Sequence, residues 1–289
     1  THPETPFSLS LLLEQAAIEW KHGYFVDALD TLRSAWEQGK HHEDMEEKRL
    51  GEMAYAELSL RLGQLGQREE LKQLIAEGEA LELGGTAAEA LRKAKETLWF
   101  FENQAEQNVF CGFTAANAIC VPLGHQPIFP DVHDEEEERE FIQKGLSLYE
   151  MKAHSHEGGG NLQLYKRGES NEIPVPSVIH WNFGHYSAVT ERDGDLYRIK
   201  DVHLKVDTWV SLDALQQQGS GYFAIEGNGI PPKGYLTVGD EEAKTIFGRH
   251  CTHGRDDEGD DCGGGGNKDD CAMVTYSFRL LNPGLELHD

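Results

Sequence analysis

The sequence predicts a mixed α+β fold with three parts: a helical N-terminal region, a short helix that begins at Cys111, and a set of antiparallel strands. Three observations predict it. Apolar residues recur at helical spacing from about Ser8 to Phe101, small residues fill Cys111–Cys120, and short apolar runs bounded by turn residues lie between Ser177 and Glu226. A helix followed by antiparallel strands is typical of the α+β class.

The size and composition indicate a folded protein with more than one domain. The chain has 289 residues, of which 38% are hydrophobic and 9% aromatic, enough to bury a core. We expect an all-α domain over 1–102, a second domain over 103–229, and a Gly-, Asp- and Cys-rich extension or linker over 230–289. The extension is predicted to end in a strand, Thr275–Leu281.

The N-terminal region is predicted to form two helical hairpins and one further helix. In each hairpin a glycine, Gly23 or Gly66, separates two helices whose apolar residues recur at spacings of three and four. Gly84-Gly85 then interrupts the chain before a helix over Thr86 to Phe101. The pattern resembles degenerate tetratricopeptide-type hairpins, and a helical bundle packed on the next domain explains it equally well. Helical hairpins often present a groove, so a protein partner is expected here.

The net charge argues against two classes of partner. The formal charge is -25, from 51 acidic and 26 basic residues. Such a surface repels phosphate backbones and anionic lipid headgroups, so we expect neither nucleic-acid nor membrane binding. No run approaches the roughly 20 apolar residues that a membrane helix needs. The first residues, Thr1-His2-Pro3-Glu4, lack the features of a signal peptide.

Cys111 is the candidate nucleophile. A cysteine attacks as a thiolate, which a helix N-terminus and a neighbouring imidazolium both stabilise. Cys111 opens a run of good helix formers, and Gly112 lets other backbone come close. Cys120 lies on another turn of the same helix, so we expect it in the core.

A predicted β-hairpin over 185–201 brings a base and a carboxylate together. If Arg192-Asp193-Gly194 forms a three-residue loop, His185 lies directly opposite Asp201, with Cβ atoms roughly 5 Å apart on one face of the sheet. A carboxylate at that distance can orient an imidazole. A two-residue loop at Asp193-Gly194 would send the two side chains to opposite faces. The catalytic interpretation therefore favours the three-residue loop.

The spacing of Cys111-Gly112, His185-Tyr186 and Asp201 resembles the bacteriocin-processing, double-glycine family of papain-like cysteine peptidases. The resemblance covers about Gln104 to Gly227, less than half of the chain. It implies a papain-like fold for 103–229, with the cysteine as nucleophile, the histidine as base and the aspartate orienting that base. No cofactor or metal is implied.

The family also places a glutamine shortly before the cysteine as an oxyanion donor. This sequence offers Gln104, the closer in spacing, and Gln107 as a substitute. Two departures from the family pattern are Phe113 and Val202, which stand where many members have proline. The wider layout resembles peptidase-like modules found ahead of RHS/YD-repeat bacterial proteins. That resemblance favours an exported or cell-surface location over the cytoplasm, and a longer parent protein.

These residues predict a cysteine endopeptidase that hydrolyses peptide bonds in a peptide or protein substrate. The family cleaves after paired glycines, so glycine-rich sites are expected, including the chain's own run Gly263-Gly264-Gly265-Gly266 in its parent protein. The alternative is an inactive peptidase-like module that binds peptide or supports a larger repeat protein. A third possibility is acyl transfer such as transglutamination, which uses the same three residue types.

The C-terminal extension carries other residues with ligand chemistry. His250, His253 and the three cysteines Cys251, Cys262 and Cys271 are competent zinc ligands, but their spacing lacks the regularity of zinc sites. A disulfide among these cysteines stays open for an exported protein. The acidic residues between Asp256 and Asp261 lack the alternation of an EF-hand loop, so a solvated linker is preferred to a calcium site.

Overall fold

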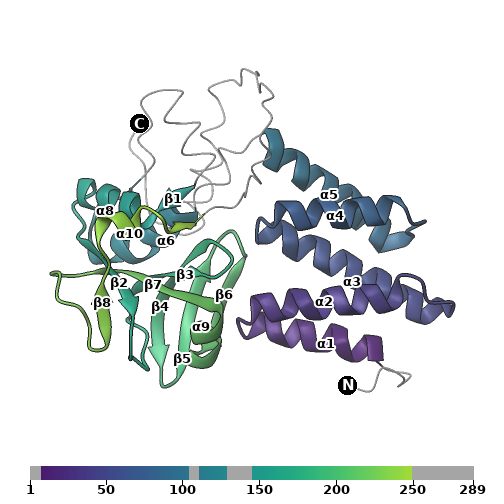
Figure 1. Cartoon of the computed structure of the whole chain (residues 1–289), viewed down its shortest axis with the longest axis horizontal. Helices are drawn as coiled ribbons and strands as arrows, with labels where there is room; N and C mark the ends of the chain where they lie inside the picture. Colours follow the sequence, from purple (N-terminus) through teal and green to yellow (C-terminus); the bar gives the residue numbers. More distant parts are fainter. Residues whose placement is uncertain (1–7, 104–110, 129–144, 249–289) are drawn as a thin grey trace. The chain divides into compact units, whose positions relative to one another are not determined.

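The computed structural model describes residues 8–103, 111–128 and 145–248, all within one compact unit (Figure 1). The Gly- and Asp-rich stretch from His250 to Asp270 and the strand expected at Thr275–Leu281 lie outside the described residues, as does an acidic segment around Asp134–Glu138. The described part mixes helices and strands, as the sequence predicts. The domain boundaries at 102/103 and 229/230 stay predictions.

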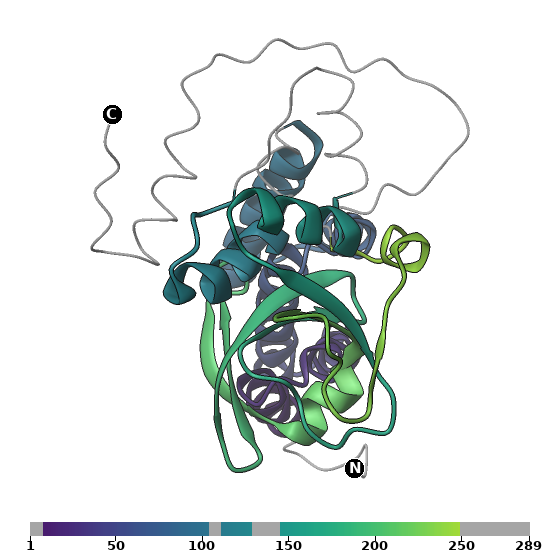
Figure 2. The same ribbon diagram turned by 90° about the vertical axis from the view of Figure 1, so that its left-hand side faces the viewer.

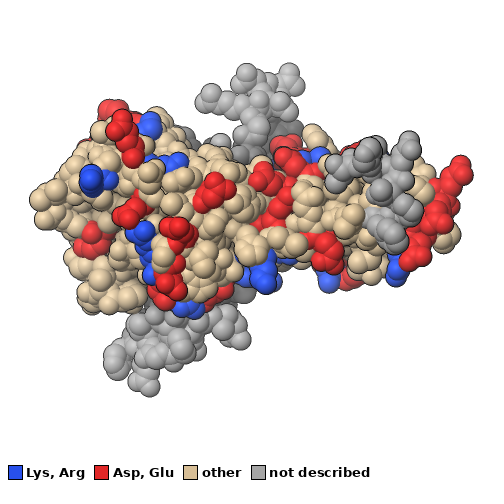
Figure 3. All heavy atoms as spheres, turned by 90° about the horizontal axis from the view of Figure 1, so that it is seen from below, with Lys and Arg blue, Asp and Glu red and all other residues tan. Residues whose placement is uncertain are grey.

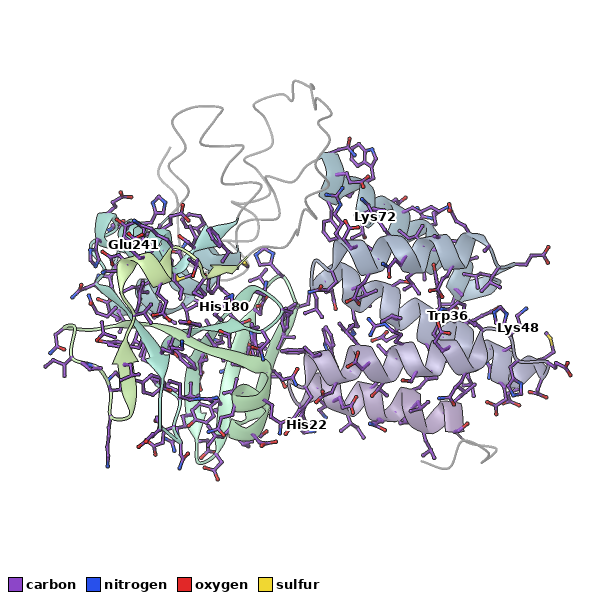
Figure 4. The ribbon with its side chains drawn as sticks, viewed as in Figure 1. His22, Trp36, Lys48, Lys72, His180 and Glu241 are labelled. Carbon is purple, nitrogen blue, oxygen red and sulfur yellow. The ribbon has the colours of Figure 1, made fainter. Side chains whose placement is uncertain are left out.

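Residues 8–103 form five helices. They are α1 (Ser8–Lys21), α2 (Phe25–Gly39), α3 (Met45–Gln64), α4 (Arg68–Glu79) and α5 (Gly85–Asn103). Gly23 and Gly66 join the helices of the first two pairs with positive φ angles of 88° and 65°, where a residue with a Cβ would be strained. Trp36 lies inside this region (Figure 4), 4.9 Å from Tyr55 between ring centroids. None of the described helices has the length and apolar character that a membrane span requires.

A seven-stranded antiparallel sheet forms the second region, in the order β6-β5-β4-β3-β7-β2-β8. Its strands are β2 (Leu162–Arg167), β3 (Ser177–Trp181), β4 (His185–Asp193), β5 (Leu196–Asp201), β6 (Val206–Ser211), β7 (Gly219–Glu226) and β8 (Tyr235–Thr237). β8 pairs with β2 although it follows residue 229. The sheet therefore draws on residues from both sides of the predicted boundary.

Alternating residues of the strands serve two apolar cores. Val178, Tyr186 and Ala188 pack with α6 (Cys111–Cys120) and α8 (Leu148–Glu157), which lie together on one side of the strands (Figures 1 and 2). Ile179 and Val189 belong to the other core, which continues into the N-terminal helices and also receives α9 (Leu212–Gln218). Period-two alternation thus separates the helix that carries Cys111 from the helical N-terminal region.

A second, two-stranded ribbon lies beside α6. It pairs β1 (Leu146–Ser147) with β9 (Phe247–Gly248), and the short turn η2 (Val121–Leu123) follows α6. Helix α10 (Asp240–Ala243) is short, and the chain then extends into β9. β9 pairs with a strand more than 90 residues earlier in the chain, which local sequence pattern does not reveal.

Acidic side chains are scattered over the face of the molecule that Figure 3 shows. They lie among neutral side chains, with basic side chains beside several of them. Arg198 illustrates the pattern, because its guanidinium contacts both Glu191 at 2.6 Å and Asp207 at 2.7 Å. Exposed pairs of this kind contribute little stability each.

Candidate active site

Cys111 is the first residue of α6 and is fully buried. The helix dipole favours negative charge at this end, and the first-turn amides lack intrahelical acceptors. A Cβ on Gly112 would lie 2.5 Å from Leu146, so only glycine lets the β1 segment approach the start of the helix this closely. The sequence thus places a thiol at a helix N-terminus where the β1 segment packs closely against the helix.

His185 and Asp201 form a buried hydrogen-bonded pair. Nε2 of His185 donates to Oδ2 of Asp201 at 2.6 Å, and the side chains of both residues are almost completely inaccessible. Because Nε2 faces the carboxylate, Nδ1 is the ring nitrogen left to accept a proton from elsewhere. The carboxylate thereby selects the orientation and tautomer of the imidazole.

The register of the β4–β5 hairpin differs from the prediction. Asp193 pairs with Leu196, so the loop is the two-residue Gly194-Asp195 and not a three-residue loop at 192–194. The expectation that His185 lies directly opposite Asp201 was therefore wrong. The loop sequence alone does not distinguish the two turns, because Gly194 has a positive φ, 59°, as the predicted loop also required.

A β-bulge nevertheless keeps the two side chains on one face. The pairing passes from Glu191↔Arg198 directly to Val189↔Ile199, which leaves Thr190 as an extra residue on β4. If the pairing set at the loop continued unchanged along β4, the even-numbered residues of β4 would share the sheet face of Asp201. His185 would then point to the opposite face. The bulge shifts the pairing by one, so His185 and Asp201 meet diagonally.

Asp201 holds two further hydrogen bonds that sequence reasoning did not find. The hydroxyl of Ser187 donates to Oδ2, the oxygen that also receives His185, and the backbone N–H of Leu204 donates to Oδ1 at 2.9 Å. The indole N–H of Trp181 in turn donates to the Ser187 oxygen at 2.8 Å. A serine and a tryptophan in a strand carry no local signal of such a role, since both are common in buried sheets.

Charge couples Cys111 to this pair. Burial by itself lowers the pKa of His185, but the Asp201 carboxylate and the Cys111 sulfur, by charge and by hydrogen bonding, outweigh burial and raise that pKa well above its ordinary range. Burial raises the pKa of Asp201, but the charge and hydrogen bond of His185 outweigh it and hold that pKa below the usual range. The arrangement favours an imidazolium beside the Asp201 carboxylate.

Two other histidines lie near the pair. His180 lies within the sheet region (Figure 4) and contacts Ser220 Oγ at 2.7 Å and the Phe247 carbonyl at 2.9 Å. Burial lowers its pKa to about 4. His203 lies edge-on to His185 with 6.2 Å between ring centroids, and burial likewise lowers its pKa to about 4. Both imidazoles are neutral at pH 7, which leaves His185 as the charged one of the three.

The other candidate residues are distributed as follows. Gln104 and Gln107, the oxyanion candidates, lie outside the described residues, as do the C-terminal cysteines and Gly263–Gly266. Cys120 is buried, and burial together with Glu226 raises the pKa of its thiol to about 12. Within the described ranges, no three His, Cys, Asp or Glu side chains gather in a way that would hold a metal ion.

Comparison with known proteins found two solved structures with partial similarity. One is a double-glycine-motif protease from an AMS/PCAT transporter in complex with the leader peptide, 18% identical over 40% of this chain and 82% of that chain, with a TM-score of 0.30. The other is the N-terminal peptidase C39-like domain of the toxin secretion ATP-binding protein from Vibrio parahaemolyticus, 10% identical over 41% of this chain and 96% of that chain, with a TM-score of 0.31. No protein-family model matches the chain, and no curated protein matches it.

Proposed function

We propose that this protein is a cysteine endopeptidase in which Cys111 is the nucleophile, His185 the general base and acid, and Asp201 the residue that orients the base. The observation that carries the proposal is the 2.6 Å contact between His185 and Asp201, on an imidazole whose pKa is also raised by the sulfur of Cys111, the first residue of α6. Acyl-transfer enzymes use this order of groups: a nucleophile, a base beside it, and a carboxylate that orients the base.

The proposed reaction uses each group at a stated atom. Nδ1 of His185 takes the proton from Sγ of Cys111, and the thiolate attacks the carbonyl carbon of the scissile peptide bond. Backbone N–H groups in the first turn of α6 stabilise the oxyanion. His185 then protonates the leaving amine as the C–N bond breaks and a thioester remains. Water, deprotonated by the same imidazole, cleaves the thioester and restores the thiol.

The sequence resemblance to double-glycine peptidases supports a preference for cleavage after paired glycines. We extend the proposal to glycine-rich cleavage sites and to cleavage of the chain's own Gly263–Gly266 segment in its parent protein.

Alkylation tests the nucleophile. Iodoacetamide at near-neutral pH should modify Cys111 faster than Cys120, as read by peptide mass mapping, and His185→Ala should slow the reaction at Cys111 only. Cys120 is the internal control because it is also buried, while burial and Glu226 raise the pKa of its thiol. If Cys111 reacts no faster than an ordinary thiol, the protein is an inactive peptidase-like module.

Reporter peptides test the reaction. Peptides containing Gly-Gly should be cleaved, matched Ala-Ala peptides should be cleaved less, and Cys111→Ala should abolish both activities. Incorporation of an added amine without hydrolysis would identify acyl transfer instead. If the protein keeps its intact mass after long incubation while it cleaves the reporter peptide, the proposed self-cleavage is wrong and the peptidase activity stands.

A further inference from the structure

The first residue of α2 is buried against strands of the sheet. Phe25 has no exposed surface, and its ring meets Trp181 edge-on at 5.4 Å between centroids and 79° between planes. It meets Phe183 at 6.3 Å and 88°. Edge-to-face contacts of this geometry fix the orientation of both partners. A residue of the helical N-terminal region therefore braces two aromatic rings next to the candidate active site.

Those two rings continue into the imidazole of His185. Trp181 and Phe183 stack at 6.0 Å with 9° between their planes, and Phe183 stacks on His185 at 6.0 Å with 17°. Trp181, Phe183 and His185, which we call the ring stack, thus lie nearly parallel. Phe183 stands in the short turn between β3 and β4 and is half-buried.

The same tryptophan also reaches the carboxylate. Its indole N–H holds the Ser187 hydroxyl, which donates to Asp201. Movement of Trp181 would therefore disturb the imidazole through Phe183 and the carboxylate through Ser187. Both members of the His185–Asp201 pair depend on the ring that Phe25 contacts.

The backbone of α2 is tied to the same turn. The Val26 N–H donates to the side-chain oxygen of Gln218 at 2.9 Å, and the Asn182 N–H donates to the main-chain oxygen of Gln218 at 2.9 Å. Gln218 is buried at the end of α9. One residue thus fixes the start of α2 and the turn that carries Phe183.

We propose that Phe25 is a positioning residue for the candidate catalytic pair, and that the helical N-terminal region is a required part of the active site. The expected effect of Phe25 on kcat rests on the proposed function. Its expected effect on the orientation of the His185 ring does not depend on that function. Phe25 holds the ring stack, the stack holds the imidazole, and the imidazole faces Cys111.

The kinetic test replaces Phe25 in the full chain. Phe25→Leu should lower kcat on a Gly-Gly peptide about tenfold and leave KM within about twofold, because orientation of the base and not substrate binding is lost. Phe183→Leu should act similarly. The double variant should be no slower than the slower single variant, because both substitutions break one chain of contacts. Additive losses, or an unchanged kcat in Phe25→Leu, would overturn the proposal.

Leu58→Ala is the matched control. Leu58 is buried on α3, which packs on α1, α2, α4 and α5, so the substitution destabilises the helical region without touching the ring stack. It should leave kcat unchanged at a temperature where both proteins are folded. An equal fall in kcat would make the effect of Phe25 a general loss of stability and contradict the proposal.

Histidine NMR separates the two proposals. In ¹⁵N-histidine-labelled protein, the Nε2–H signal of His185 should shift or broaden in Phe25→Leu and stay unchanged in Leu58→Ala. Should wild-type protein hydrolyse no peptide while this shift is seen, the proposed function fails and the positioning role stands. An unaltered signal in Phe25→Leu would overturn the positioning role whatever the activity. Should Phe25→Leu not fold, the same signal in Phe183→Leu decides.

Discussion

Ser187 donates its hydroxyl proton to the same carboxylate oxygen of Asp201 that holds Nε2 of His185. The hydroxyl is itself held by the indole N–H of Trp181. Ser187 on β4 thus holds Asp201 on the neighbouring strand β5. The bulge at Thr190 has shifted the pairing of these two strands by one residue. The orientation of the base depends on a serine that takes no part in the proposed chemistry.

Ser187→Ala should lower kcat about tenfold with KM little changed. The substitution removes one of three hydrogen bonds to the carboxylate and leaves the buried Trp181 N–H without its acceptor, which costs about 1–3 kcal/mol of stability. Steady-state kinetics and urea unfolding measure the two effects.

Ser177→Ala is the matched control for this experiment. Ser177 is a fully buried serine on the neighbouring strand β3, and its hydroxyl makes no hydrogen bond within the described part of the chain. Its removal should change neither kcat nor stability by much. Equal losses in the two variants would show that Ser187 acts only through packing.

Asp201→Asn should change the pH dependence of Cys111 alkylation. The carboxylate helps to raise the pKa of His185 to about 10, so in wild-type protein the imidazolium persists to alkaline pH. Without that negative charge the pKa of His185 falls, and the alkaline change in alkylation rate should move down by more than about one pH unit. Alkylation rates measured from about pH 5 to about pH 11 give the size of this shift. Identical profiles would refute the electrostatic coupling.

The stability of the fold should depend on pH through the same pair. The pKa of His185 is raised from 6.5 to about 10, so its contribution is complete below pH 6.5 and is lost as pH rises through 10. The pKa of Asp201 is lowered from 3.8 to about 2, so its contribution is complete above pH 3.8 and is lost as pH falls through 2. Both contributions are complete only between pH 3.8 and 6.5.

Urea unfolding of wild type and Asp201→Asn measures this dependence. The difference in unfolding free energy should be largest inside that window, about 3 kcal/mol, because removing one partner leaves the other buried without its counter-charge. It should shrink toward pH 10. A difference that stays constant with pH would contradict the linkage.

Local sequence patterns were sufficient for the elements that depend on local chemistry. The helix Cys111–Cys120 and the strand Ser177–Trp181 have the ends that their residues predict, because small helix formers and a β-branched run decide each one. The helices on either side of Gly23 and Gly66 were likewise predictable from glycine and spacing.

Features that depend on distant contacts were not predictable. The bulge at Thr190 lies in an ordinary strand sequence without a glycine, so the register was misjudged even though the face was right. Phe25 and Trp181 are separated by more than 150 residues, and nothing local to either indicates the contact. The strand β6 and the helix α9 were not assigned, because short segments of mixed composition carry weak periodicity.

Deletion of Thr190 tests whether the active site needs the bulge itself or only the pairing that the bulge gives. Because Thr190 is the extra residue, its removal joins Val189 to Glu191 and keeps Val189↔Ile199, so His185 stays on the face of Asp201. We expect this variant to keep peptide cleavage and fast Cys111 alkylation. Deletion of both Val189 and Thr190 would instead carry His185 to the opposite face of the sheet. We then expect loss of peptide cleavage by at least about a hundredfold and loss of fast Cys111 alkylation. A double-deletion variant that folds, shows the Nε2–H signal of a paired His185 and cleaves peptide would show that the sheet re-forms the pair by another register, and the role assigned to the register would be wrong.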